Sequence, residues 1–118
     1  MSMLDWNTYR QQLTVRIGEI AKISPDTIKG YQALSAAGQK SNLLGPKIRE
    51  LISLAVAVTV RCNGCISVHA AAAARHGATR EEIVEALGVA TAVNAGAALV
   101  YSTRVLDAYQ QMTPREPS

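Results

Sequence analysis

Long segments rich in apolar residues and alanine alternate along this chain with short polar stretches that contain glycine or proline. Five consecutive alanines stand at residues 70–74, and alanine is the strongest helix former. No polar interruption is long enough to be an interdomain linker. We therefore predict an all-α fold, a compact bundle of about six helices, in one domain over residues 1–118. The predicted helices cover residues 5–23, 24–38, 46–61, 63–77, 79–93 and 94–112.

The starts of the first three helices carry recognisable signals. Asp5 can serve as the N-cap of the first helix. Ser24 followed by Pro25 is a standard helix start, because proline fits the first helical position. The polar stretch 38–46 reads as a loop, and Pro46 can open the third helix.

The second half of the chain carries stop and start signals as well. Gly77 ends the alanine-rich helix, and Thr79 with Glu82 forms the Thr-x-x-Glu pattern of a capping box. We expect a helix break at residues 94–96, where asparagine and glycine occur together. The polar residues 113–118 are expected to form a frayed tail.

The segment 51–60, LISLAVAVTV, allows two interpretations. It is apolar on nearly every helical face, which is typical of a buried central helix. It is also rich in β-branched residues, and a buried strand followed by Cys-x-x-Cys and a helix is a thioredoxin-like pattern. The helical interpretation is favoured, because the sequence after Cys65 is helical and has no proline before Pro114.

Composition and charge narrow the classes of function. The chain has 118 residues, no phenylalanine and a net charge of +3 from dispersed lysines and arginines. The absence of a basic block interleaved with aromatic residues argues against a nucleic-acid partner. We see no signal peptide, and residues 51–60 are too short to span a bilayer. We therefore expect a soluble cytoplasmic protein with no membrane partner, where a Cys-x-x-Cys is more often catalytic or metal-binding than structural.

The two cysteines of the chain, Cys62 and Cys65, fall in the first turn of the fourth predicted helix. Their Cα atoms should be roughly 5 Å apart there, which suits a disulfide. The positive end of the helix dipole favours thiolate, so the pair can supply a nucleophile and a resolving thiol. His69 lies one turn beyond Cys65 on the same face and can act as its base.

A zinc site is the alternative use of these residues. Cys62, Cys65, His69 and His76 resemble a ligand set, but one straight helix cannot bring all four to one ion. A three-ligand site completed by Glu50 or by another subunit stays open. Alternatively, if the third and fourth helices fold back on each other, the Glu50 carboxylate faces His69 and orients its imidazole. We expect no metal and no cofactor.

The spacing Glu50-x11-Cys62-Asn63-Gly64-Cys65-x3-His69 resembles the E-x11-C-x2-C-x3-H signature of the AhpD-like alkylhydroperoxidases. These belong to the carboxymuconolactone decarboxylase superfamily, and the likeness covers roughly residues 31–110. The resemblance implies an all-α fold that assembles into homotrimers or homohexamers. It also implies hydroperoxide reduction driven by a dithiol electron donor, a protein or a lipoyl-type group.

Carried over by position, Cys65 is the peroxidatic thiol, Cys62 resolves it, and Glu50 with His69 forms a proton relay. Some members have a second histidine between the cysteines, where this chain has Gly64. Two further hypotheses stay open. One is a carboxymuconolactone-type decarboxylase, whose branch lacks the cysteine pair. The other is a non-enzymatic redox-sensing or binding module.

Overall fold

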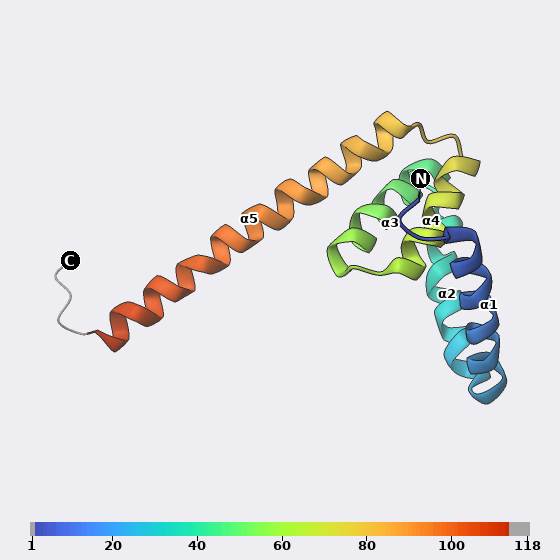
Figure 1. Cartoon of the computed structure of the whole chain (residues 1–118), viewed down its shortest axis with the longest axis horizontal. Helices are drawn as coiled ribbons and strands as arrows, with labels where there is room; N and C mark the ends of the chain where they lie inside the picture. Colours follow the sequence, from blue (N-terminus) through green and yellow to red (C-terminus); the bar gives the residue numbers. More distant parts are fainter. Residues whose placement is uncertain (1, 114–118) are drawn as a thin grey trace.

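The computed structural model describes residues 2–113, and within them the chain is all-α with five helices and no strand. Residues 114–118, most of the predicted frayed tail, lie outside this range. α1 and α2 form one antiparallel pair, α3 and α4 form another, and α5 begins on α3 and runs outward (Figure 1). The helices are α1 (Trp6–Ile23), α2 (Pro25–Ser41), α3 (Pro46–Val60), α4 (Asn63–Arg75) and α5 (Arg80–Met112). The all-α prediction is confirmed, and the number of helices is five rather than about six.

The N-terminal pair begins where the sequence predicted and ends slightly later. The Asp5 carboxylate accepts a hydrogen bond from a backbone N–H of the first turn of α1, as an N-cap does. The Ser24 hydroxyl instead bonds to the Thr27 hydroxyl at 2.6 Å, so Ser24 precedes α2 without capping its backbone. α2 continues past the predicted end at residue 38 to Ser41. It stops there because Asn42 adopts the left-handed conformation, which asparagine tolerates.

α3 and α4 reverse direction at a very short connection. Arg61 has φ +56°, and the backbone N–H groups of Arg61 and Cys62 both point back to the carbonyl oxygen of Ala57. This closes the end of α3 and starts α4 within two residues. Small buried side chains then let the two helices pack closely. They are Ala57 on α3 and Ala72 and Ala73 on α4, and Leu54 of α3 is the one larger apolar side chain that is buried in these two helices.

The helical interpretation of residues 51–60 is therefore confirmed, and the thioredoxin-like alternative is wrong. The expectation that this helix is buried all round is wrong for one face. Ile52, Val56 and Val60 lie one turn apart on α3 and are 48 to 64 % exposed. α3 packs chiefly on α4 and α5, and within residues 2–113 this apolar stripe is left largely exposed.

α5 is one continuous helix, so the predicted break at residues 94–96 is wrong. The Asn94 side-chain amide, which favoured a turn, donates to the carbonyl of Ala90 and to the hydroxyl of Thr59 on α3. The alanines around Gly96 favour helix, and together they outweigh the cost of one glycine, about 1 kcal/mol. The predicted fifth and sixth helices are therefore a single rod.

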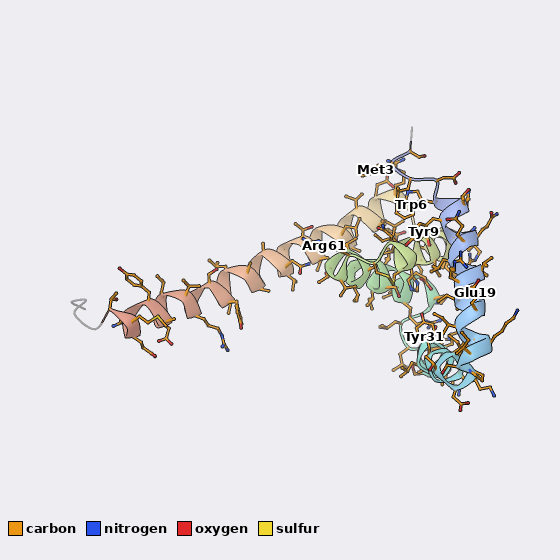
Figure 2. The ribbon with its side chains drawn as sticks, turned by 60° about the horizontal axis from the view of Figure 1, so that its bottom comes forward. Met3, Trp6, Tyr9, Glu19, Tyr31 and Arg61 are labelled. Atoms are coloured by element: carbon orange, nitrogen blue, oxygen red, sulfur yellow. A yellow bond between two sulfur atoms is a disulfide. The ribbon has the colours of Figure 1, made fainter. Side chains whose placement is uncertain are left out.

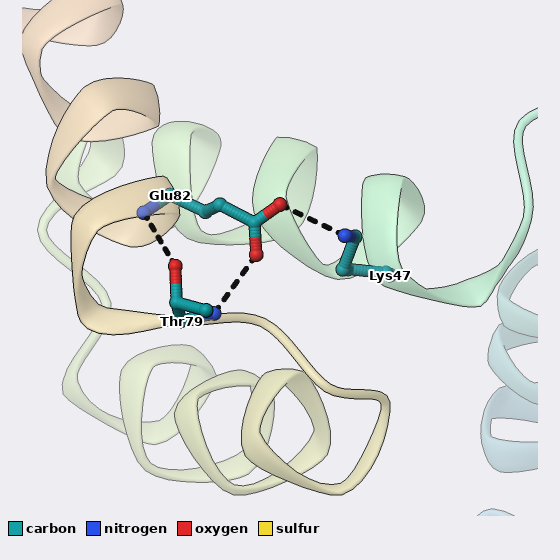
Figure 3. Close-up of polar contacts among 3 residues, drawn as sticks. All are labelled: Lys47, Thr79 and Glu82. Carbon is teal, nitrogen blue, oxygen red and sulfur yellow. Dashed lines mark hydrogen bonds and ion pairs between the residues drawn. The ribbon is translucent and has the colours of Figure 1, made fainter.

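The start of α5 is fixed by the predicted capping box, which is confirmed (Figure 3). The Thr79 hydroxyl accepts from the Glu82 N–H at 3.0 Å, and the Glu82 carboxylate accepts from the Thr79 N–H at 2.9 Å. The same carboxylate accepts from Lys47 Nζ at 2.8 Å, which ties α5 to the first turn of α3.

Within residues 2–113, α5 is the one helix long and apolar enough to cross a bilayer, judged by length and composition alone. Its most apolar 18-residue window has a mean hydropathy of 1.7, and 6 % of that window is buried. A helix that is covered by other protein can have the same composition. Among the described residues, the side chains of its outer half project away from the other four helices (Figure 2).

α1 lies across the first turn of α4. A Cβ atom built on Gly64 would stand 2.9 Å from Leu13 Cδ2, closer than real side chains approach. Trp6, the first residue of α1, lines a hollow with Ile66 and Ala70 of α4. Its ring is tilted against that of Tyr9, with ring centroids 6.2 Å apart (Figure 2). The absence of a side chain at position 64 therefore provides the space in which α1 packs.

The contact between Lys47 and Glu82 should make stability depend on pH. The hydrogen bond from Lys47, and then that from the Thr79 backbone, holds the pKa of Glu82 below its ordinary value of 4.5. The stabilisation is therefore present above 4.5 and is lost as pH falls through the lower folded-state pKa. We expect Glu82→Gln to lower the melting temperature at pH 7 and to match the parent protein in strong acid.

The matched control is Glu81→Gln. Glu81 is in the same helical turn and makes no side-chain hydrogen bond within the described part of the chain. Thermal unfolding of parent, variant and control between pH 2.5 and pH 7 is the measurement. A difference between Glu82→Gln and parent that is constant over this range would contradict the pairing.

The contact between Leu13 and Gly64 predicts a size limit at position 64. We expect Gly64→His to destabilise the protein by about 1–3 kcal/mol, the usual cost of overpacking. In a Leu13→Ala background the same change should cost much less, because the isobutyl group is gone. Denaturant unfolding measures the cost, and fluorescence of Trp6 reports whether α1 stays on α4. Equal costs in both backgrounds would show that Leu13 does not occupy this space.

Candidate redox site

The two cysteines lie at the N-terminus of α4 and are joined as a disulfide, Cys62–Cys65, with 5.3 Å between their Cα atoms. Cys62 is the N-cap of the helix, in an extended backbone conformation, and its sulfur accepts a hydrogen bond from the Cys65 N–H at 3.1 Å. Both residues are half-buried. The disulfide is therefore open to solvent on one side and held by helix geometry on the other.

The position of the pair at a helix start has a chemical consequence. The first N–H groups of a helix have no carbonyl partner within the helix and carry partial positive charge. Such a helix end is a favourable position for a negatively charged group. The hydrogen bond from Cys65 N–H to the Cys62 sulfur is one direct contact of this kind.

A second polar contact joins α4 to α3 beside the cysteines. Nδ1 of His69 lies 2.6 Å from Oε2 of Glu50, and both side chains are mostly buried, 27 % and 19 % exposed. An ionised carboxylate only accepts hydrogen bonds, so Nδ1 carries the hydrogen and Nε2 is left to exchange a proton. The fold-back of α3 on α4 thus places the carboxylate on the imidazole, the arrangement expected of a base and the group that orients it.

The site therefore combines three chemical elements on two helices. A disulfide-bonded cysteine pair lies at the start of α4, a histidine follows Cys65 by one helical turn, and a carboxylate from α3 contacts Nδ1 of that histidine. This set can form a nucleophile, resolve it, and move a proton. A proton transfer between His69 and Cys62 needs an intermediary, because Cys62 lies nearly two turns from His69.

The zinc alternative has no support in the geometry. Within residues 2–113, no group of three or more His, Cys, Asp or Glu side chains is close enough together to hold a metal ion. Glu50 is engaged with His69 instead of completing a ligand set with the cysteines. His76 is the C-cap of α4, at the end of the helix away from the cysteines.

Sequence reasoning missed the part that α1 plays at the site. Leu13 lies beside Gly64, between the two cysteines, so a side chain at position 64 requires the end of the Leu13 side chain to move. The register of α1 on α4 is a tertiary contact, and the glycine between the cysteines was its only visible signal.

Comparison with known proteins places this architecture in a family. Residues 25–108, from the start of α2 to near the end of α5, match the carboxymuconolactone decarboxylase family. In three dimensions the chain resembles the apo form of a carboxymuconolactone decarboxylase family protein from Legionella pneumophila. The TM-score is 0.71 at 32 % identity, over 90 % of this chain and 95 % of that one.

Relatives known by sequence extend over most of the chain as well. An uncharacterized protein of Haemophilus influenzae is 49 % identical over 105 residues, which cover 89 % of this chain and 93 % of that protein. An uncharacterized protein from the cox locus of Paracoccus denitrificans is 34 % identical over 90 residues, covering 76 % and 81 % of the two chains. The match over residues 25–108 and the resemblance to a solved member show that the chain belongs to the carboxymuconolactone decarboxylase family.

Proposed function

We propose that the protein is a thiol-dependent peroxidase or disulfide oxidoreductase that reduces hydroperoxides through Cys62 and Cys65. The observation that carries the proposal is the disulfide at the start of α4, with the paired Glu50 and His69 one helical turn further along that helix. A structural disulfide needs no base, whereas a cycling pair needs thiolate and proton transfer. The family includes decarboxylases and alkylhydroperoxidases, and the cysteine pair favours the second.

The proposed first step is attack of the Cys65 thiolate on the terminal oxygen of a hydroperoxide ROOH. An S–O bond forms, the O–O bond breaks, and the leaving RO⁻ takes a proton that His69 can supply. The products are the alcohol ROH and a sulfenic acid on Cys65. The Cys62 thiolate then attacks the sulfur of Cys65, forms the S–S bond, and releases hydroxide, which a proton converts to water.

The second half-reaction restores the thiols. An external dithiol attacks the disulfide and leaves as its own disulfide, with two protons transferred to the two cysteines. We propose Cys62 as the sulfur attacked, because it is the N-cap of α4 and nearer the end of the helix. The donor class that fits is a dithiol, either a protein or a lipoyl-type group.

The assignment of roles to the two sulfurs follows from helix geometry. His69 is one turn from Cys65 and nearly two turns from Cys62, so Cys65 is the thiol that the base can reach directly. The helix dipole favours the more N-terminal thiol by about 0.3–1 kcal/mol, and the proposed assignment requires that His69, in its charged form, offsets this difference at Cys65.

Two further proposals accompany this chemistry, of which only the assembly comes from the family resemblance. The protein works as a homotrimer or homohexamer, and it works in the cytoplasm, where dithiol reductants are abundant. The proposed reaction uses no metal, no cofactor and no nucleic-acid partner. The contrasting functions are a decarboxylase, which does not use the cysteines, and a redox-sensing module, which oxidises once without turnover.

Single cysteine variants test the order of events. With Cys62→Ser, we expect one equivalent of peroxide to be consumed and a sulfenic acid to accumulate on Cys65, since no thiol is left to resolve it. With Cys65→Ser, peroxide should leave Cys62 largely unmodified. Trapping with a dimedone probe and locating the label by peptide mass spectrometry is the measurement. A label on Cys62 in the second variant would reverse the roles.

The proton relay is tested by Glu50→Gln and His69→Gln in the Cys62→Ser background. The charged imidazole stabilises the thiolate, and the carboxylate stabilises that charge. Each change should therefore move the pH midpoint of Cys65 alkylation upward and slow peroxide reduction by about 10²–10⁴-fold. His76→Gln is the matched control, because His76 is on the same helix but at its other end. If the midpoint stays in place in both variants, Glu50 and His69 have only a packing role.

A further inference from the structure

Ser67 is the one polar residue that is buried within the described part of the chain, with 7 % of its surface exposed. It lies on α4, two residues beyond Cys65, and the other buried residues of that helix are Ala72 and Ala73. A hydroxyl that is taken out of water costs free energy unless it forms a hydrogen bond, whereas an alanine at the same position would not. The partner of this hydroxyl is therefore of interest.

The Ser67 hydroxyl donates to the carbonyl oxygen of Gly64 at 2.8 Å. That carbonyl belongs to the peptide unit between Gly64 and Cys65, and the N–H of the same unit donates to the Cys62 sulfur at 3.1 Å. The two hydrogen bonds leave the peptide unit at opposite ends, so they form one chain from the hydroxyl through the peptide to the sulfur. Hydrogen bonds in such a chain polarise one another, and each strengthens its neighbour.

Hydroxyl-to-carbonyl bonds within a helix are common, and this chain has others. Ser53, for example, donates to the Arg49 carbonyl at 2.8 Å within α3. Ser53 is only half-buried, and its helix contains no cysteine. Ser67 differs in both respects, because its hydroxyl is buried and its peptide unit contacts a sulfur of the disulfide.

α1 covers the side of α4 on which this chain of hydrogen bonds lies. Leu13 lies on Gly64, in contact with the position that a side chain would take. Trp6 lines a hollow of about 370 Å³ together with Ser67 and Ile66 of α4. Because α1 limits the access of water to Ser67, little water competes for its hydrogen bond, which is electrostatically stronger as a result.

We propose that Ser67 is a positioning residue, which acts through the Gly64–Cys65 peptide to direct and strengthen the N–H bond to the Cys62 sulfur. An ionised acceptor forms a stronger hydrogen bond than a neutral one, so the effect is largest when Cys62 is a thiolate. Ser67 therefore increases the fraction of reduced Cys62 that is ionised. This inference deepens the proposed function and rests on it for one step, the attack of the Cys62 thiolate on the sulfenic acid of Cys65.

The test is the pH dependence of Cys62 alkylation by iodoacetamide in a Cys65→Ser background, which keeps the peptide N–H at position 65. We expect Ser67→Ala to raise the pH midpoint, because one bond of the chain is lost. Below that midpoint the thiolate fraction should fall about twofold to fourfold. Ser67→Thr keeps the hydroxyl, and the hollow beside it can take the added methyl group, so it should restore the parent midpoint.

Ser53→Ala is the matched control, because it removes the same kind of hydrogen bond from a helix without cysteines. It should leave the midpoint of Cys62 unchanged, and thermal unfolding checks that every variant is folded. A midpoint that Ser67→Ala does not move, or that Ser53→Ala moves equally, would overturn the proposal. Failure of Ser67→Thr to restore the midpoint would overturn it as well.

The equilibrium of the intact disulfide with dithiothreitol is a second readout, and it needs no peroxide. A thiolate that is stabilised in the reduced protein makes the disulfide easier to reduce. At a fixed ratio of reduced to oxidised dithiothreitol, Ser67→Ala should therefore be less reduced than the parent, and Ser53→Ala should match the parent. Equal reduction of Ser67→Ala and parent would count against the role of Ser67 even where peroxide turnover is intact. A protein that turns over no peroxide but shows the expected difference would contradict the proposed function and still support this role.

Discussion

The reversal of the chain between α3 and α4 is the constraint on which the rest of the structure depends. It occurs at Arg61, in a left-handed conformation that costs a non-glycine residue about 1–2 kcal/mol, and it leaves no loop between the helices. One result is that Glu50 on α3 meets His69 on α4. The other is that Cys62 becomes the N-cap of α4. A longer connection would relax both placements, so the site is a consequence of this tight turn.

The close packing of small side chains leaves the single chain with a small hydrophobic core. Its buried apolar residues are Leu54 and four alanines, and no large side chain in residues 2–113 is fully buried. Alanine lets the helices approach closely but buries little apolar surface. Because burial stabilises the fold by about 25 cal/mol per Å² of apolar area, each alanine contributes little. The larger apolar residues point outward from α3 and α5. Within the described residues, the helices of the single chain are therefore held together by few large buried side chains.

Much of the fold and site could be predicted from local sequence signals. The capping box at Thr79 and the spacing of Glu50, Cys62, Cys65 and His69 depend on helix periodicity, which local sequence fixes. Tertiary contacts decided the rest. Asn94 suggested a turn, but its side chain bonds to Thr59 on another helix. The apolar character of residues 51–60 suggested burial on every face, but one face of this helix is exposed in the single chain. The Leu13 contact with Gly64 depends on the register between two helices far apart in sequence.

The central claim is that the disulfide cycles during turnover and is not a structural bond. The most direct measurement is steady-state consumption of an organic hydroperoxide with a dithiol donor, for the parent and for the Cys62→Ser/Cys65→Ser protein. The account predicts many equivalents consumed per chain by the parent and none above background by the double variant. Consumption of no more than one equivalent by the parent, or equal rates for both proteins, would contradict it.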